Sequence, residues 1–122
     1  MIREYKKEDF EEVSSWFHKR NLPISIEMLP KHGFIEPGTA AGFIYLTDSN
    51  FSIFECFIRN PDKSFEECNL ALNTIVTHMI EKSRELGFRE VWGFVTSQNM
   101  LRRGIEQGFD VFDMCTMIRK IL

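Results

Sequence analysis

The sequence predicts an α/β fold in which a mixed, mostly antiparallel central sheet carries helices on both faces. Two patterns favour this fold. Residues 33–58 predict three strands joined by short turns, which is typical of an antiparallel meander. A long helix with apolar residues at every third or fourth position then separates the strand at 51–58 from a strand at 90–95. Because a helical crossover joins strands that run in the same direction, these two strands are expected to be parallel.

The first part of the chain predicts a strand, a helix and an irregular stretch. Residues 2–5 form the expected strand. A helix follows over about 9–20, with Asp9 and Glu12 spaced as a capping box. Two prolines interrupt residues 21–32, which therefore predict a loop or a short helix.

The meander is marked by its turn residues. The segment 37–39, Pro-Gly-Thr, forms the turn of a hairpin with arms at 33–36 and 40–47. A second turn at 48–50 leads into the strand at 51–58. That strand is apolar on both faces, so a central place in the sheet is expected.

The second half begins with the long helix. Ser64 and Glu67 predict a capping box at its start, and Gly87 is placed to end it. A short helix is expected over about 99–107. The apolar segment 111–121 then predicts a final strand or hairpin arm.

The composition is that of a single globular domain. The chain has 122 residues, which predicts one domain over 1–122. Its net charge of −3 gives no electrostatic footprint for nucleic acid, and no apolar run approaches the ~20 residues of a membrane span. The N-terminus has no apolar segment of the signal-peptide kind. Three cysteines without C-x-x-C spacing indicate reduced thiols in a cytoplasmic protein, and no spacing predicts a metal site.

The order of elements resembles that of the GCN5-related N-acetyltransferase (GNAT) superfamily, including its short phage-encoded or bacterial members, over nearly the whole chain. The segments that carry the resemblance are IREY with EDF, AAGFIYLTD, FECFIRNPD, EKSRELGFREVWG and the closing GF. The resemblance implies that acetyl-CoA binds as cosubstrate between the fourth and fifth strands. Its pyrophosphate would lie at the start of the long helix, where free N–H groups attract an anion. A homodimer through the last strands is also implied.

The stretch expected to meet the pyrophosphate departs from the family pattern. Ser64 stands at the usual Arg or Gln position, and the usual glycines are missing. Glu66 and Glu67 place two negative charges on the helix N-terminus, where they satisfy the helix dipole and repel an anion. The residues expected to contact the cosubstrate here are Ser64, Phe65, Glu66, Glu67, Cys68 and Asn69.

The short helix near the C-terminus offers further candidates. Ser97 and Asn99 are better explained as helix caps, and the resemblance implies that they also hold the pantetheine arm. Arg102 and Arg103 could reach a CoA phosphate, or could line a solvated helix face. Many family members have a tyrosine that protonates the leaving thiolate four residues before the Gly-Phe pair, and here that position is Gly104.

Glu55 is the candidate catalytic residue. It lies inside the apolar strand IFECFI, where burial would raise its pKa and suit it to act as a general base toward an amine. The alternatives are a place at a strand end or an ion pair with a neighbouring arginine.

The sequence is compatible with three functions, the third of which is a module that binds CoA without transferring the acetyl group. The first is acyl-CoA-dependent N-acyltransfer to an amine of a small molecule or protein. The second is a GNAT-fold pseudoenzyme that acts through protein–protein interaction without binding CoA, which the missing glycines, Glu66, Glu67 and Gly104 favour.

Overall fold

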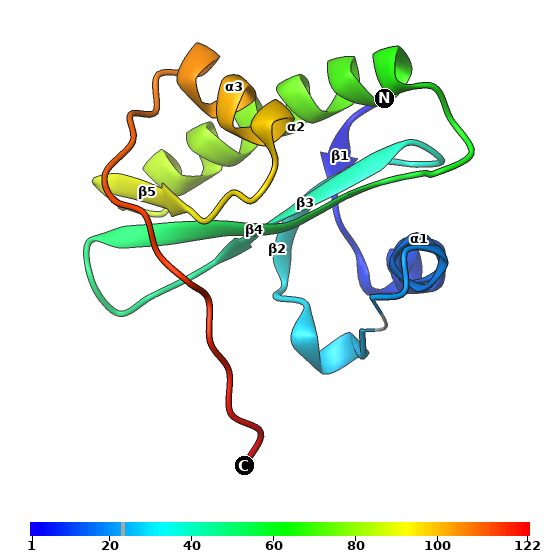
Figure 1. Cartoon of the computed structure of the whole chain (residues 1–122), viewed down its shortest axis with the longest axis horizontal. Coiled ribbons are helices and arrows are strands. Elements are labelled where there is room, and N and C mark those ends of the chain that lie inside the picture. The colour runs from blue at the N-terminus through cyan, green and yellow to red at the C-terminus, as the bar shows by residue number, and fades with distance from the viewer. Residues whose placement is uncertain (23) are drawn as a thin grey trace.

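The computed structural model describes residues 1–22 and 24–122, so Pro23, one of the two prolines in the predicted loop, lies outside the described residues. Five strands form one sheet in chain order (Figure 1). The strands are β1 (Arg3–Glu4), β2 (His32–Glu36), β3 (Ala40–Tyr45), β4 (Phe51–Arg59) and β5 (Glu90–Gly93). The first four pair antiparallel, and β4 pairs parallel with β5. The predicted fold class is confirmed.

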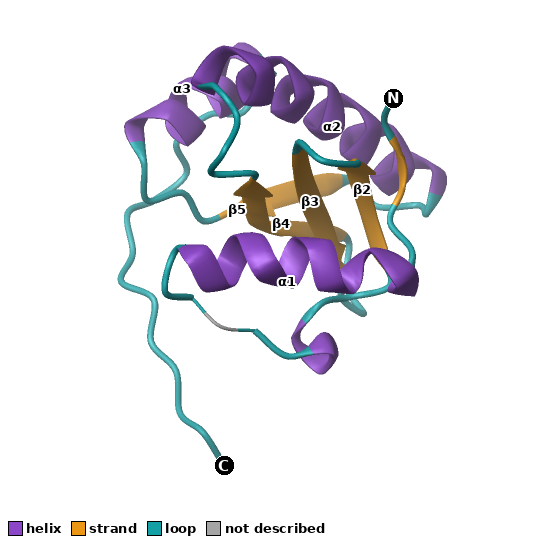
Figure 2. Cartoon of the chain, turned by 90° about the vertical axis from the view of Figure 1, so that its right-hand side faces the viewer, coloured by secondary structure: helices purple, strands orange, loops and turns teal. Residues whose placement is uncertain are grey.

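The helices cover both faces of this sheet. The α-helices are α1 (Phe10–Lys19), α2 (Phe65–Glu85) and α3 (Gln98–Glu106), and short 3-10 turns occupy η1 (Lys7–Asp9) and η2 (Ile26–Met28). Figure 2 shows α1 on one side of the sheet and α2 with α3 on the other. None of the helices in the described part of the chain is long and apolar enough to cross a membrane.

The core is divided into two layers by the sheet. On the α1 side, Val13 and Phe17 pack with Phe43 of β3. On the α2 side, Ile75 and Met79 pack with Phe54 of β4. All six side chains are buried, and burying a side chain of this size contributes roughly 1.5–3 kcal/mol. Successive side chains of β3 and β4 point to opposite layers, so neighbouring residues of these strands contact different helices.

The start of α1 differs from the predicted capping box. Asp9 Oδ2 accepts the N–H of Lys6 at 2.8 Å and its carboxylate pairs with Arg3, so the helix begins after a 3-10 turn. The hydrogen bond from Arg3 is the main reason that the pKa of Asp9 is lowered. Glu12 instead accepts the N–H of Gly38 at 3.0 Å. The two carboxylates therefore connect α1 to β1 and to the β2–β3 turn.

The predicted strand at 111–121 is wrong. Residues 109–122 have no regular secondary structure, and all residues from 110 onward are exposed. In Figures 1 and 2 the segment runs past β5 and away from the body of the molecule. A strand needs a partner, and β5 is only four residues long instead of the predicted six. Large apolar side chains such as Phe112, Met114 and Ile118 consequently face solvent.

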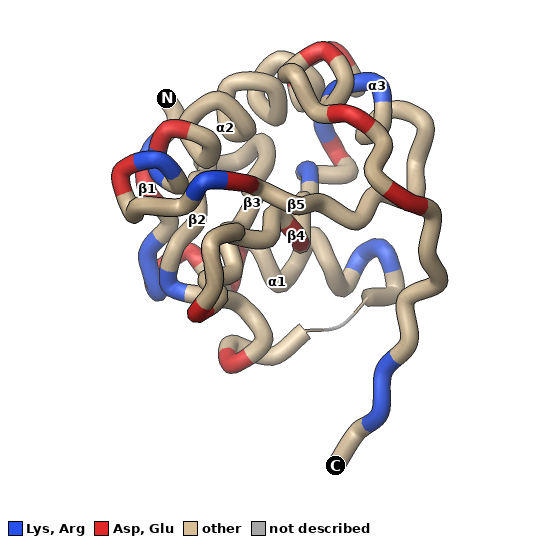
Figure 3. The backbone as a smooth tube through the Cα atoms, turned by 90° about the vertical axis from the view of Figure 1, so that its left-hand side faces the viewer, with Lys and Arg blue, Asp and Glu red and all other residues tan. Residues whose placement is uncertain are grey.

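Charged residues of both signs are spread along the backbone. In the view of Figure 3, acidic and basic positions alternate around β1 and the helices, and the last basic residues lie near the C-terminal end. This mixture agrees with the small net charge of the chain.

Candidate active site

The site begins where β4 and β5 separate. Their pairing runs from Phe51 with Glu90 to Phe54 with Gly93, where β5 ends. β4 continues alone on this side to Arg59. Glu55 is therefore the first residue of β4 beyond the paired region.

A bulge in β4 lies at the same point. Ala41 pairs with Ile58 and Phe43 with Glu55, so two residues of β4 lie opposite the single residue Gly42. The ring of Phe57 occupies the space beside Gly42: a Cβ there would lie 2.6 Å from Phe57 Cε1. The missing side chain at Gly42 is therefore what admits the bulge.

Glu55 is half-buried on the α1 side of the sheet, opposite Phe43. Its Oε1 accepts the N–H of Cys56 at 3.1 Å, while the buried Oε2 has no partner among residues 1–22 and 24–122. Burial raises the pKa of Glu55, and the bond from Cys56 opposes that rise. The position is mid-strand, and no ion pair joins Glu55 to a described arginine, so neither structural alternative is observed.

Two neighbours of Glu55 escaped the sequence analysis. The hydroxyl of Tyr45 lies 2.8 Å from the carbonyl oxygen of Met28 and 3.1 Å from the sulfur of Cys56. Burial is the main cause that raises the pKa of both Tyr45 and Cys56. Cys56 has a φ of +58°, a left-handed conformation that is rare outside glycine, and no local sequence signal marks it.

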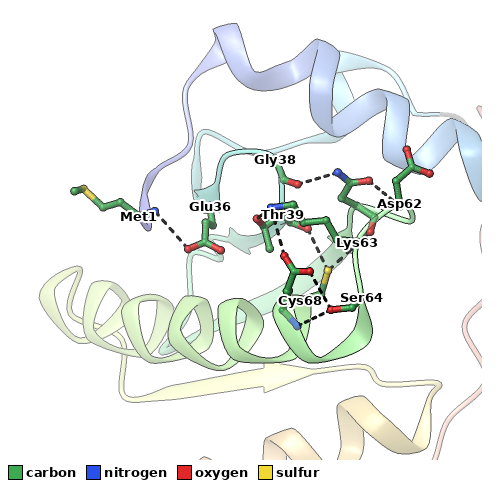
Figure 4. Close-up of polar contacts among 10 residues, drawn as sticks. Met1, Glu36, Gly38, Thr39, Asp62, Lys63, Ser64 and Cys68 are labelled. Carbon is green, nitrogen blue, oxygen red and sulfur yellow. Dashed lines mark hydrogen bonds and ion pairs between the residues drawn. The ribbon is translucent and has the colours of Figure 1, made fainter.

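The start of α2 is packed against the β2–β3 turn. Figure 4 shows Lys63, Ser64 and Cys68 gathered around Thr39. Lys63 Nζ donates to Thr39 Oγ1 at 3.1 Å, and the buried Cys68 thiol faces the Thr39 carbonyl at 3.7 Å. Asn60 completes the contact by donating to the Gly38 carbonyl at 2.8 Å. Cys68 therefore offers its side chain to the core and not to a ligand.

The hydrogen bonds of this first turn leave two open donors. Ser64 caps the helix by accepting the N–H of Glu67 at 3.3 Å, which confirms half of the predicted capping box. The Glu67 Oε1 accepts the Ser64 hydroxyl and not the Ser64 N–H. The N–H of Cys68 donates to the Ser64 carbonyl. The N–H groups of Phe65 and Glu66 have no partner in the part of the chain that the structure describes. Both side chains are exposed, and the Glu67 carboxylate lies 3.8 Å from Lys63 Nζ.

The predicted residues of α3 separate into two groups. Ser97 caps the helix by accepting the N–H of Met100 at 3.1 Å, and Asn99 and Arg102 are exposed in its first turns. Arg103 is only 4% exposed, so a solvated helix face is wrong for this residue. Its Nη1 donates to Asn69 Oδ1 and Asn73 Oδ1, each at 2.8 Å. Burial lowers the pKa of Arg103.

The predicted residues therefore form two clusters on opposite faces of the sheet. The first turn of α2 and the start of α3 are brought together through the Arg103–Asn69 contact. Glu55 lies on the α1 face, whereas its neighbour Phe54 faces α2. The edge of β4 that faces β5 is unpaired beyond Phe54 and lies between these two faces.

Two surface depressions lie elsewhere, along β1 and α2. Their volumes are about 170 and 310 Å³, and Glu4, Phe34 and Lys82 line both. Lys82 donates to Glu4 at 3.0 Å, so the two charged residues that line both depressions are paired with each other. Glu55 is not among the residues that line them.

Solved structures share this architecture. An acetyltransferase from Trypanosoma brucei matches with a TM-score of 0.69 at 13% identity, covering 98% of this chain and 99% of that one. A transcriptional regulator from Bacillus halodurans gives 0.72 at 14% identity, with coverage of 98% and 99%. N-acetylglutamate synthase from Neisseria gonorrhoeae, complexed with coenzyme A and L-arginine, gives 0.72 at 15% identity, covering 93% of this chain and 28% of that one.

Sequence comparisons add nothing to this result: no protein-family model matches, and no curated protein matches significantly. Identities of 13–15% establish a fold and leave the activity open. With its five-stranded sheet, its parallel β4–β5 pair and helices on both faces, the chain has the fold of the GNAT acetyltransferases.

Proposed function

We propose that the protein is an acyl-CoA-dependent N-acyltransferase that moves an acetyl group from acetyl-CoA to an amine. The observation that supports it best is the Glu55 carboxylate, half-buried at the point where β4 and β5 part, with one oxygen unpartnered among the described residues. A carboxylate with a pKa raised by burial is suited to take a proton from an ammonium group near neutral pH.

In the proposed reaction, Glu55 accepts a proton from the acceptor ammonium, directly or through one water. The freed amine nitrogen attacks the thioester carbonyl and forms the C–N bond. The nitrogen then loses its second proton to solvent as the C–S bond breaks and the CoA thiolate leaves. The resemblance implies a tyrosine that protonates the thiolate, and this chain has Gly104 at that position. Solvent would therefore protonate the thiolate.

The residues at the starts of α2 and α3 fit acetyl-CoA in part. The open N–H groups of Phe65 and Glu66 would receive the pyrophosphate, Ser97 and Asn99 would lie along the pantetheine, and Arg102 is exposed for a phosphate. Arg103 and Asn69 are hydrogen-bonded to each other, so we propose that they attach α3 to α2 and do not bind the cosubstrate. The Glu66 and Glu67 carboxylates oppose an anion here.

Calorimetric titration with acetyl-CoA and with CoA tests this proposal. Micromolar binding followed by turnover in an amine screen, lost in Glu55→Gln, would support it. The double variant Glu66→Gln with Glu67→Gln keeps the oxygen that bonds Ser64 and should tighten CoA binding about five-fold or more at low salt, since two like charges are removed. The matched control changes Glu81 and Glu85, near the far end of the same helix, and should leave binding unchanged.

A specific observation favours the second candidate, a pseudoenzyme that acts through a protein partner. The α2 start has no glycine and two glutamates, and its lysine is bonded to Thr39 and Glu67. Absence of CoA binding up to millimolar concentration would refute the enzyme and favour this candidate. Pull-down with variants of the exposed apolar residues would then be the next experiment.

A homodimer and a cytoplasmic location complete the proposal. The segment 110–122 exposes Phe112, Met114 and Ile118, each at 86% or more, which is unusual for a monomer and suits pairing with a second copy. Cys56, Cys68 and Cys115 are free thiols, which suits a reducing compartment.

A further inference from the structure

The bulge residue Cys56 is bonded at both of its polar groups. Its N–H donates to Glu55 Oε1 at 3.1 Å, and its sulfur lies 3.1 Å from the Tyr45 hydroxyl oxygen. Its φ of +58° is unfavourable for a residue with a side chain, because Cβ approaches the neighbouring carbonyl. Something outside Cys56 must therefore hold this conformation.

The donors and acceptors of this contact can be assigned. The Met28 carbonyl can only accept, so the single hydroxyl proton of Tyr45 is donated to it at 2.8 Å. The Tyr45 oxygen then accepts the S–H of Cys56. The resulting chain of bonds runs from Met28 in η2, through Tyr45 on β3, to the β4 bulge. The thiol is held as a protonated donor, which does not suit it to attack a thioester.

We propose that Tyr45 and Cys56 are positioning residues for Glu55: the Met28–Tyr45–Cys56 chain of hydrogen bonds holds the left-handed bulge, and the bulge holds the carboxylate with one oxygen unpartnered. This inference rests on the proposed function only in giving Glu55 its chemical role. The geometric part, which concerns the conformation of Cys56 and the burial of Glu55, can be tested on the protein without any substrate.

The test is the pKa of Glu55, measured by NMR on the carboxyl carbon in the full chain. The Glu55 charge acts on two neighbouring titratable side chains, Tyr45 from β3 and Cys56 from β4 itself, and raises the pKa of each. Tyr45→Phe removes both bonds and should let water reach the carboxylate, so the Glu55 pKa should fall by about 0.5 or more. Cys56→Ser, which keeps a donor, should stay near the native value.

The chain supplies a matched control. Tyr5 is the only other tyrosine, and its ring packs edge-on against Phe43, 4.8 Å between centroids, in the same core layer. Its buried hydroxyl has no partner among the residues described. Tyr5→Phe should therefore leave the Glu55 pKa unchanged.

A rescue variant separates positioning from simple loss of packing. Glycine adopts a φ near +58° readily, so adding Cys56→Gly to Tyr45→Phe should return the Glu55 pKa to the native value. An unchanged pKa in Tyr45→Phe, or failure of glycine to restore it, would overturn the proposal. If the pKa responds as expected but Glu55→Gln keeps full acyltransferase turnover, the positioning stands and the role of Glu55 as base is refuted.

Discussion

Arg103 offers the sharpest test of how the two helices above the sheet are held together. Its Nη1 lies within hydrogen-bond distance of Asn69 Oδ1, Asn73 Oδ1 and the Asn69 carbonyl, at 2.8, 2.8 and 3.2 Å. One nitrogen with two protons can satisfy about two of these acceptors at once. Arg103→Met keeps the apolar stem and removes only the donors.

The expected cost follows from those bonds. A hydrogen bond from a charged group contributes roughly 1.5–3 kcal/mol, and the asparagines are only half-buried, so water replaces part of the loss. We expect Arg103→Met to lower the free energy of unfolding by about 2–4 kcal/mol. Arg102→Met, one residue earlier on the exposed face of α3, should change it by less than about 0.5 kcal/mol.

Urea denaturation of the two variants measures the difference, and amide hydrogen exchange locates it. Loss of protection confined to α3 would show that the helix detaches before the domain unfolds, which still agrees with the bonds. Equal midpoints for Arg102→Met and Arg103→Met, with equal exchange in α3, would refute the assigned role of Arg103.

Three further outcomes are expected. The pKa of Glu55 is raised in the folded state, so the free energy of unfolding of the wild type should fall as pH rises from about 4 through that pKa. Glu55→Gln should lack this fall, so its free energy of unfolding relative to the wild type should be higher above that pH range than below it, as denaturation at several pH values would show. Gly42→Ala should cost about 1–3 kcal/mol in thermal melts, because its Cβ would lie 2.6 Å from the Phe57 ring; an unchanged melting temperature would contradict the bulge. Removing residues 110–122 should convert the proposed homodimer to monomer in light scattering, and a monomer before truncation would contradict that part of the proposal.

The sequence predicted those parts of the fold that are encoded locally. The 3.6-residue period of α2, its Ser64 cap and its Gly87 end are all visible within one segment, and the parallel β4–β5 pair follows from the crossover alone. The same local reasoning failed at 111–121. Apolar residues with high strand propensity form a strand only if a partner strand is present, and the pattern contains no information about that partner.

The site was less predictable because its features depend on residues far apart in the chain. An arginine that directly follows another arginine looks like a surface residue, and only the packing of α3 on α2 brings Arg103 to Asn69 and Asn73. The left-handed conformation of Cys56 was likewise not predictable, because the position is neither glycine nor asparagine, the residues that usually adopt it. Its conformation depends on Gly42 and on Tyr45, both on a different strand.

The environment of Glu55 depends on the two strands that flank β4, which are β5 on one edge and β3 on the other. Up to Phe54, β5 satisfies one edge of the strand, and beyond it that edge is free. On its other edge, β3 stays paired and imposes the bulge through Gly42. A carboxylate one residue earlier would face α2 in a packed core, as Phe54 does, and one residue later would stand in the strained position of Cys56. Position 55 places an acid beside a free strand edge while its Oε1 is held by a backbone N–H, and this arrangement suits the general base that we propose.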